Sequence, residues 1–253
     1  MEIKEFGVII LAAGKGTRMK SDTPKVLHSI HGQTMISLVL RCASSLFGEN
    51  IVVVVGHKAE LVKAEIDQQF KVSYALQKEL LGTGDAVRAA IPFLIDSIKN
   101  VLILCGDVPL IKKDTILEFV NFHIGNSYDI SLFSVHLDNP TGYGRLIFNN
   151  KNELVSICEE AEATSEQKDI NLVNAGLYCI KKDFLVYALD LIDRDNFQKE
   201  YYLTDLVSIA FKNNSSIGCF LGNDPDEVIG VNSVSDLKKV ELILTKKVVA
   251  NVQ

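Results

Sequence analysis

The sequence predicts an α/β fold built on a mostly parallel sheet. Residues 8–11, 51–55 and 101–104 are continuously apolar and rich in valine, isoleucine and leucine, which is typical of strands buried on both faces. Longer stretches with the 3.6-residue period of amphipathic helices lie between these runs. Strands that alternate with helices indicate βαβ units, so the predicted fold class is a doubly wound, Rossmann-like sheet with helices on both faces.

The first part of the chain supplies the elements of this sheet in order. Helices are expected at residues 34–47, 57–70 and 85–94, because apolar residues recur there every three or four positions. A strand expected at residues 72–76 separates the last two helices. The strand at 101–104 runs into the turn-forming sequence Cys-Gly-Asp-Val-Pro.

The pattern changes after about residue 138, where turn residues and short apolar runs replace the long helices. Strands are expected at residues 146–148, 154–157 and 172–180. We therefore predict a small β-rich insertion at about residues 138–180, within one domain that spans residues 1–232. The remaining expected elements are helices at 184–192 and 203–212, a strand at 217–221, and a linking helix in residues 233–253 with its apolar pattern at 234–252.

Composition and charge exclude several classes of protein. The chain has 253 residues, 47% of them hydrophobic, and a formal net charge of −6, so it offers no basic stripe for nucleic acid. It has no signal-peptide pattern and no apolar run of membrane-spanning length, so we expect a cytoplasmic protein that binds no membrane. The five cysteines are scattered and the histidines lack metal-ligand spacing, which indicates reduced thiols and no zinc site.

A loop of small residues follows the first strand and carries the strongest chemical signal. Four of the five residues at 12–16 are alanine or glycine, so backbone N–H groups can approach an anion closely. Two cations, Arg18 and Lys25, lie beyond the glycines, and the combination suits a nucleoside triphosphate. The loop lacks the Gly-Lys-Ser or Gly-Lys-Thr of a Walker A motif, and Met19 stands where a dinucleotide fingerprint needs its third glycine.

Asp107 follows the strand at 101–104, at the sheet edge where open α/β sheets bind ligands. Its carboxylate suits Mg²⁺, which prefers one or two carboxylates together with phosphate oxygens and water. The alternative is that Gly106 and Asp107 form a turn and that Asp107 caps a helix starting near Asp114. Behind the glycine loop, the magnesium interpretation is favoured.

Gln77 and residues 81–84 form another loop at the end of a predicted strand. A side-chain amide offers both a donor and an acceptor, as the edge of a uracil requires. Gly82 would let the backbone approach a base closely. The alternative, a helix N-terminus capped by Thr83, is equally compatible with the sequence.

Polar residues in the expected insertion are candidates for binding a sugar. Glu159 and Asn174 supply hydrogen-bond partners for hydroxyl groups, and Gly144 would let a ring approach the chain. The amide oxygen of Asn232 could complete a metal shell. Taken alone, all four are compatible with ordinary surface loops.

Together these motifs resemble the uridyltransferase domains of the bifunctional bacterial N-acetylglucosamine-1-phosphate uridyltransferases, within the sugar-nucleotide pyrophosphorylase family. The resemblance implies Mg²⁺-dependent transfer of UMP from UTP to N-acetylglucosamine 1-phosphate, giving pyrophosphate and UDP-N-acetylglucosamine for cell-envelope and peptidoglycan synthesis. It covers nearly the whole chain, and its most specific runs are Pro-Thr-Gly-Tyr-Gly-Arg at 140–145 and Glu-Tyr-Tyr-Leu-Thr-Asp at 200–205. The other matching runs lie at 11–28, 81–84 with Gln77, 106–110 and 230–232.

The resemblance also implies a role for each matching residue. Arg18, Lys25 and Asp107 would be catalytic, the first two acting on the phosphates, and Mg²⁺ would bind to Asp107 and Asn232. The nucleotide would be held by Leu11, Ala12, Ala13, Gly14, Gln77, Gly82 and Thr83, and the sugar would face Gly144, Glu159, Asn174 and Asn232.

Three departures from the family pattern lie near the expected sugar side. Ala161 replaces a usual lysine, Ala175 replaces a usual threonine, and Cys105 stands where an aromatic residue is common. They leave two alternatives: a nucleotidyltransferase for another sugar 1-phosphate or nucleotide, and a nucleotide-sugar-binding protein without catalysis. The expected partners are therefore small molecules, UTP and an amino-sugar 1-phosphate. The six-residue repeats of a left-handed β-helix acetyltransferase domain are not seen, and a monomer is compatible with the sequence.

Overall fold

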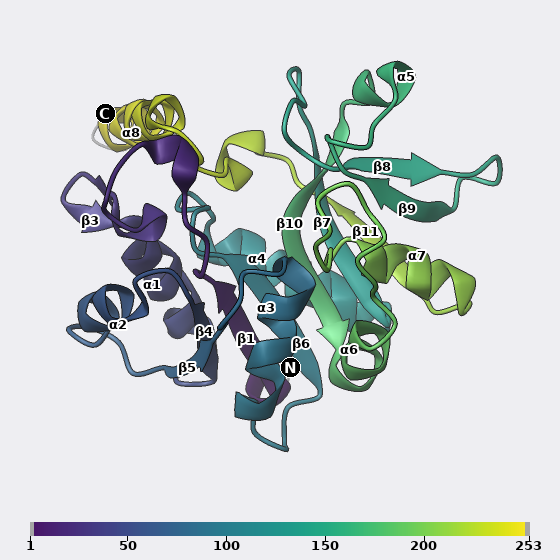
Figure 1. The fold of residues 1–253 in the computed structure, drawn as a ribbon, viewed down its shortest axis with the longest axis horizontal. Coiled ribbons are helices and arrows are strands. Elements are labelled where there is room, and N and C mark those ends of the chain that lie inside the picture. Colours follow the sequence, from purple (N-terminus) through teal and green to yellow (C-terminus); the bar gives the residue numbers. More distant parts are fainter. Residues whose placement is uncertain (1–2, 251–253) are drawn as a thin grey trace.

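The computed structural model describes residues 3–250, and a large sheet forms the centre of this part of the chain (Figure 1). The strands of this sheet are β1 (Phe6–Leu11), β4 (Ile51–Val55), β5 (Ser73–Leu76), β6 (Asn100–Cys105), β7 (Ile130–His136), β8 (Arg145–Phe148), β9 (Leu154–Cys158), β10 (Leu172–Lys181) and β11 (Ile217–Leu221). Their main order in space is β11-β7-β10-β6-β1-β4-β5, with β8 and β9 branching from β10. Every pair along this path is parallel except those that β10 makes with β6 and β7, so the mostly parallel α/β sheet is confirmed.

Helices cover both faces of the sheet, and the remaining elements are short. The α-helices are α1 (Met35–Phe47), α2 (Ala59–Ile66), α3 (Thr83–Ala90), α4 (Lys113–Gly125), α5 (Ser165–Lys168), α6 (Lys182–Leu189), α7 (Asp205–Lys212) and α8 (Val234–Ala250). A two-stranded ribbon joins β2 (Ser29–Ile30) to β3 (Gln33–Thr34). Single 3₁₀ turns lie at Ile3–Glu5, Thr17–Met19, Lys25–Leu27, Ile91–Phe93 and Pro225–Val228.

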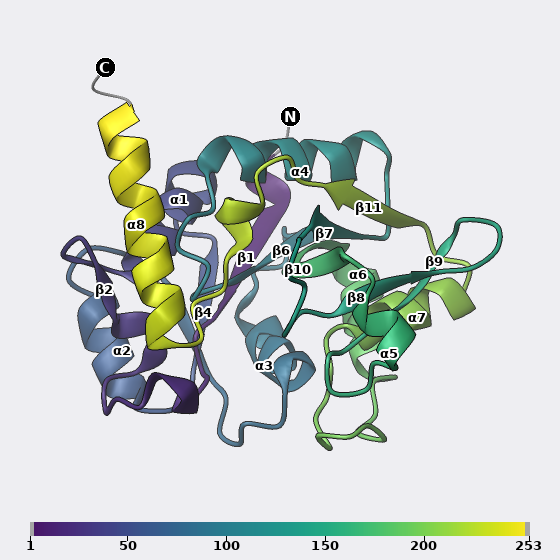
Figure 2. The same cartoon turned by 90° about the horizontal axis from the view of Figure 1, so that it is seen from above.

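The alternation of side chains along β1 divides the core into two layers. Val8 and Ile10 pack with α1, α2 and α4, whereas Ile9 packs with α3, α6 and α7. Figure 2 shows α1 and α4 on one side of the sheet and α3 and α7 on the other. A strand buried on both faces must be apolar at every position, which explains why β1 has no polar residue.

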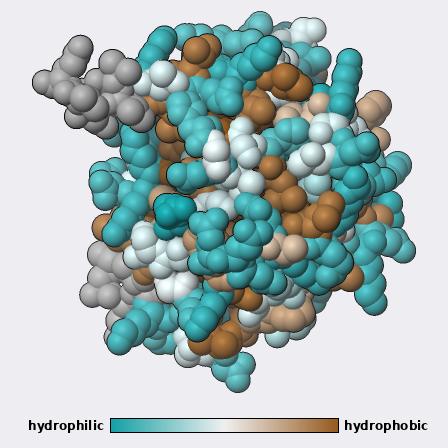
Figure 3. All heavy atoms as spheres, turned by 90° about the vertical axis from the view of Figure 1, so that its left-hand side faces the viewer, coloured by the Kyte–Doolittle hydropathy of each residue, from teal (hydrophilic) through white to brown (hydrophobic). Residues whose placement is uncertain are grey.

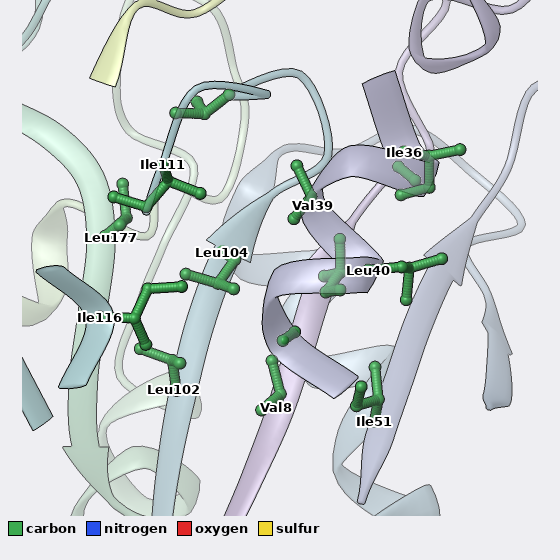
Figure 4. Close-up of a cluster of buried hydrophobic side chains, with 14 of the residues drawn as sticks. Val8, Ile36, Val39, Leu40, Ile51, Leu102, Leu104, Ile111, Ile116 and Leu177 are labelled. Atoms are coloured by element: carbon green, nitrogen blue, oxygen red, sulfur yellow. The ribbon is translucent and has the colours of Figure 1, made fainter. Parts of the chain in front are cut away.

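Helix α1 illustrates how the sequence pattern becomes packing. Its residues Ile36, Val39 and Leu40 are fully buried and face the strands (Figure 4). They recur at intervals of three and four, so they form one stripe on the helix, and they meet residues of β1, β4 and β6. Contact along this stripe holds α1 against the sheet.

One strand differs from the sequence-based expectation in placement. Strand β10, which we expected in the insertion, lies between β6 and β7 in the central sheet and is antiparallel to both. Only β8, β9, α5 and the turns around them project beyond the sheet on the right of Figure 1. Strand β7 was not expected, and a helix at the place of α4 entered only through the alternative for Asp107, as a helix starting near Asp114. Pairing partners are distant in sequence, so local periodicity does not reveal which sheet position a strand occupies.

The parallel register places four chain segments at one edge of the sheet. Leu11 at the end of β1 lies opposite Val54 of β4 and Cys105 of β6. Val55 of β4 in turn lies opposite Leu76 of β5. The loops that follow these strands therefore start side by side, which is the usual place for a ligand in such sheets.

The C-terminal helix α8 packs on a third, smaller apolar cluster. Its Val240 is fully buried against Met19, Met35 and Val231. The part of the expected helix at 251–252 lies outside the described residues. Figure 3, which views the molecule from the left of Figure 1, shows a mostly hydrophilic face with separate hydrophobic patches. Among the described residues, no helix is both long and apolar enough to cross a membrane.

Truncation of the α1 stripe tests this account of the core. Leu40→Ala should lower the free energy of unfolding by about 2–5 kcal/mol, because it leaves a cavity against β1 and β4. The matched control is Leu242→Ala in α8, where the side chain is 63% exposed, and its effect should stay within about 0.5 kcal/mol. Equal losses in urea denaturation would contradict the packing described here.

Candidate active site

A cavity of about 550 Å³ opens at the edge of the sheet where β1, β5 and β6 end. Its wall comes from four loops: the glycine loop after β1, the start of α3 with the residues before it, Asp107 after β6, and residue 200. The predicted site residues that line it are Leu11, Ala12, Ala13, Gly14, Lys25, Gln77, Gly82, Thr83 and Asp107. Asp107 and the Gly14 turn therefore share one cavity.

The glycine loop presents free donors to this cavity. Within the described residues, the backbone N–H groups of residues 14–16 donate no hydrogen bond. Gly16 has a φ of +62°, and a Cβ there would lie 2.6 Å from the Cβ of Lys25, so a larger residue would push the loop away from Lys25. Neighbouring free N–H groups form a concave, electropositive surface that suits an anion such as a phosphate.

Lys25 lines the cavity and bridges two side-chain oxygens, one of Asp107 and one of Asn232. Its ammonium group donates to Asp107 Oδ2 and, at 3.0 Å, to Asn232 Oδ1. The Lys25 and Asp107 side chains are each only 16% exposed. Val231 donates its N–H to the carbonyl oxygen of Asp107 at 2.9 Å, which fastens the loop of Asn232 to the end of β6.

The chemistry of these two oxygens, from Asp107 and Asn232, suits a divalent cation. Carboxylate and amide oxygens are hard ligands of the type that Mg²⁺ prefers, and phosphate oxygens and water would complete its shell. No group of three or more metal-ligating His, Cys, Asp or Glu side chains occurs in the described part of the chain. Of the alternative for Asp107, the turn at Gly106 and Asp107 is observed, but the helix cap is not, because Lys112 occupies the position that precedes α4.

Arg18 is the predicted catalytic residue that the structure does not bring into the cavity wall. It lies on the 3₁₀ turn Thr17–Met19, its side chain is exposed, and it makes no hydrogen bond or ion pair among the described residues. Its neighbour Met19 is buried beneath α8 and anchors the turn. Arg18 is therefore a long, exposed cationic side chain on an anchored turn next to the glycine loop.

The Gln77 amide is held from two sides at the end of β5. Its Nε2 donates to the carbonyl oxygen of Gly82 and to Asp85 Oδ2, each at 2.9 Å. The residue is only 5% exposed. Thr83 does not cap α3 as the alternative interpretation had it: Gly82 stands at the N-cap, and the Thr83 hydroxyl accepts the N–H of Leu203 at 3.0 Å.

Gly82 must be glycine because the 200–204 loop packs against it. Its φ is +112°, and a Cβ would lie 2.6 Å from the carbonyl oxygen of Tyr201. Gly84 donates to the same oxygen at 2.8 Å, and Tyr201 donates to Leu81 at 2.7 Å. This packing brings Glu200 into the cavity wall, where sequence reasoning assigned it no role. The only signal for it was its position at the start of the 200–205 motif.

Three of the predicted sugar residues form a second cluster, outside the cavity wall, where β10 of the central sheet meets the chain before β8 and after β9. Asn174 donates its backbone N–H to Gly144 at 2.9 Å, and a Cβ on Gly144 would lie 3.6 Å from Glu159 Oε2. The Asn174 amide is fixed, because its Nδ2 donates to the hydroxyl of Tyr178 at 2.8 Å and its Oδ1 accepts from Gly176. Asn232, the fourth, is the partner of Lys25 instead.

Comparison with known proteins assigns the family. The Nucleotidyl transferase family model matches residues 7–227. The chain belongs to the nucleotidyl transferase family. It is similar to the bifunctional protein GlmU of Clostridioides difficile, with 40% identity over 96% of this chain and 52% of the relative. The corresponding protein of Streptococcus suis is 41% identical over 95% of this chain and 52% of the relative. The chain thus spans about half the length of these curated relatives.

A solved structure supports the fold of this nucleotidyltransferase family member. A Bacillus anthracis chain described as a glucose-1-phosphate thymidylyltransferase superposes with a TM-score of 0.70, covering 94% of both chains. The identity is only 16%, so the likeness concerns the fold alone. The resemblance inferred from the motifs is confirmed by the family match and by the relatives.

In this nucleotidyltransferase the insertion is tied to the rest of the domain by polar contacts. The buried Arg145 pairs with Glu160 at 2.6 Å and also binds the carbonyl oxygen of Tyr143. Glu162, where the family pattern is altered, accepts the N–H of Phe197 at 3.0 Å. Glu159 accepts the hydroxyl hydrogen of Thr204 at 2.9 Å. The bonds of Arg145 hold the insertion together, and those of Glu162 and Glu159 fix it against residues 197–204.

The acidic residues on this side perturb one another. Burial raises the pKa of Glu159, and the hydrogen bond from Thr204 opposes that effect. Burial raises the pKa of Asp205 from 3.8 to about 6, and the nearby charges of Asp193, Glu162 and Glu159 add to the increase. The Asp205 carboxylate is therefore less stable in the folded protein than in the unfolded chain.

The raised pKa of Asp205 predicts that Asp205→Asn increases the free energy of unfolding in a pH-dependent way. Because the folded pKa lies above the unfolded one, the folded chain binds the proton more tightly, and stability falls as pH rises from about 4 to about 6. The variant does not lose stability in this way. Its free energy of unfolding should therefore exceed that of the parent by about 1–2 kcal/mol at pH 7.5 and by little at pH 4. Urea unfolding at both pH values measures the difference, with exposed Asp96→Asn as the control. A gain that does not grow with pH would contradict the assignment.

Proposed function

We propose that this chain transfers a uridylyl group from UTP to N-acetylglucosamine 1-phosphate. The observation that carries the proposal is the shared cavity, in which free N–H groups, Lys25, Asp107 and Gln77 face one space. The similarity to GlmU proteins supports the choice of substrates. An oxygen of the sugar phosphate would attack the α-phosphorus, the bond to the bridging oxygen of the β-phosphate would break, and pyrophosphate would leave with that electron pair.

No general base is needed for this reaction, because the sugar phosphate is already ionised at neutral pH. The barrier comes from repulsion between two anions and from charge that grows on the leaving pyrophosphate, so positioning and electrostatic stabilisation would be the main catalytic factors. The N–H groups of residues 14–16 and the Arg18 side chain would receive the leaving group. Lys25 would hold the α-phosphate.

Asp107 and Asn232 would hold the Mg²⁺ ion that this family generally uses. The ion would supply positive charge to the phosphates when bound. Lys25 now spans the same two oxygens, so the ammonium group would turn from them to the substrate phosphates as the site loads. Gly144, Glu159 and Asn174 would face the sugar, with Thr204 holding the Glu159 carboxylate in place.

We further propose a catalytic unit at residues 1–232, followed by a linking helix at 233–253, in a cytoplasmic enzyme whose partners are its small-molecule substrates. Two sequence features keep another sugar 1-phosphate under consideration: Ala161 and Ala175 on the sugar side. Pyrophosphate release from UTP, dTTP, CTP and GTP, each paired with several sugar 1-phosphates, decides the substrates. Tight binding of a UDP-sugar without any pyrophosphate release would favour a binding protein without catalysis.

Removal of one charged group should slow the reaction strongly. Asp107→Ala and Arg18→Ala should each lower kcat by about a hundredfold or more, equivalent to roughly 3 kcal/mol of barrier. Asp114→Ala, which removes an exposed carboxylate outside the cavity, is the matched control and should leave kcat unchanged. Turnover within a few-fold of the parent in Asp107→Ala would refute the proposed mechanism.

Lys25 and a divalent cation should compete for the same two oxygens. Lys25→Met should therefore bind Mn²⁺ about tenfold more tightly in the absence of nucleotide, because it removes a positive charge from between Asp107 and Asn232. Titration calorimetry or the electron paramagnetic resonance signal of free Mn²⁺ measures the affinity. Lys113→Met, an exposed lysine outside the cavity, controls for net charge. Unchanged or weaker Mn²⁺ binding in Lys25→Met would place the metal elsewhere.

A further inference from the structure

The side-chain amide of Gln77 has one of its two ends fully committed within the protein. Gln77 is nearly buried at the end of β5 and lines the cavity. Both hydrogens of its Nε2 are used, one toward the carbonyl oxygen of Gly82 and one toward Asp85 Oδ2, each at 2.9 Å. Within the described residues, no hydrogen bond reaches Gln77 Oε1. The oxygen is the only polar end left for a ligand.

The chemistry of the partners, and not the assignment of atoms, fixes this orientation. A carbonyl oxygen and a carboxylate can only accept hydrogen bonds. If the amide were turned over, Oε1 would face two other oxygens and the amino group would lose both acceptors. Asp85 contributes the stronger part of this constraint, because a hydrogen bond to a charged group is about twice as strong as one between neutral groups.

We infer that Asp85 is a positioning residue that makes Gln77 an obligatory hydrogen-bond acceptor and thereby selects the class of base. This inference rests on the proposed function, in that it takes the cavity to hold a nucleotide. A fixed acceptor pairs with a base that presents a ring N–H, as the N3–H of uracil and thymine does. Cytosine presents an unprotonated N3, so two acceptors would face each other at a nearly buried site.

The fixed Gln77 acceptor would separate cytosine from uracil and thymine, but not uracil from thymine. Uracil and thymine have the same N3–H, so the Gln77 amide cannot separate UTP from dTTP, and any preference between them must arise at other contacts. Cytosine is rejected at this amide because a site built to receive a hydrogen bond is left unpaired. A purely structural role for Asp85, as a carboxylate in the first turn of α3, would not affect this choice.

The decisive experiment compares UDP with CDP in Asp85→Asn. Asparagine keeps the size of the side chain but offers a donor as well as an acceptor, so the Gln77 amide gains a way to turn over. The ratio of the two dissociation constants, measured by calorimetry, should fall by roughly tenfold, chiefly through tighter binding of CDP. The kcat/KM ratio for UTP and CTP should fall in parallel.

Two further variants complete the test. Asp114→Asn removes the first-turn carboxylate of α4, which does not contact Gln77, and should leave the UDP/CDP ratio unchanged. Asp85→Glu keeps the carboxylate and should retain at least part of the selectivity. If Asp85→Asn does not fold, Asp85→Ser replaces it, since a hydroxyl also donates and accepts. An unchanged ratio in the folded variant overturns the inference.

The binding assay separates failure of this inference from failure of the proposed function. Parent protein that binds UDP but releases no pyrophosphate refutes uridylyl transfer, while the UDP/CDP ratio in Asp85→Asn still decides the role of Asp85. Parent protein that binds UDP and CDP equally well overturns the inference alone. Parent protein that binds neither nucleotide overturns both.

Discussion

The register of the parallel strands is the constraint on which the site depends. Leu11 faces Cys105 across β1 and β6, so the glycine loop and Asp107 begin next to each other although they are far apart in sequence. A slip by one residue would turn the buried side chains of β1 to the opposite layer, which the two tightly filled halves of the core prevent. The packing of the sheet therefore determines which polar groups meet.

The proposed binding of phosphates is compatible with the chain's net negative charge, because the positive groups are concentrated at the cavity. The chain carries a net charge of −6, yet the cavity is bordered by free N–H groups and by Lys25. Before a ligand binds, Lys25 is balanced by Asp107 and Asn232, so neither the ammonium nor the carboxylate is left unpaired at low exposure. A phosphate would replace one ion pair with another at little cost in desolvation.

The sequence allowed the shared position of Gly14 and Asp107 to be predicted, because continuous apolar runs imply a parallel sheet whose strand ends converge. It did not allow the place of β10 to be predicted, since antiparallel pairing with β6 and β7 joins residues that are distant in the chain. Glu200 escaped notice for the same reason: it reaches the cavity only because Tyr201 packs on Gly82. Local patterns indicate elements, whereas these contacts arise from tertiary structure.

The two ends of the cavity are built on different principles. At the end proposed to bind the base, Gln77 donates to Gly82 and Asp85, and Gly82 packs against Tyr201. At the end proposed to bind the phosphates, the N–H groups of residues 14–16 are unpaired among the described residues, and the Lys25 ammonium group is shared between Asp107 and Asn232. A rigid polar group can reject a base with the wrong hydrogen-bond pattern, because it cannot turn to satisfy it. Charge that moves from one phosphate oxygen to another during a reaction is better met by donors with no prior commitment. Under the proposed function, selection of the base and catalysis therefore depend on different groups of this cavity.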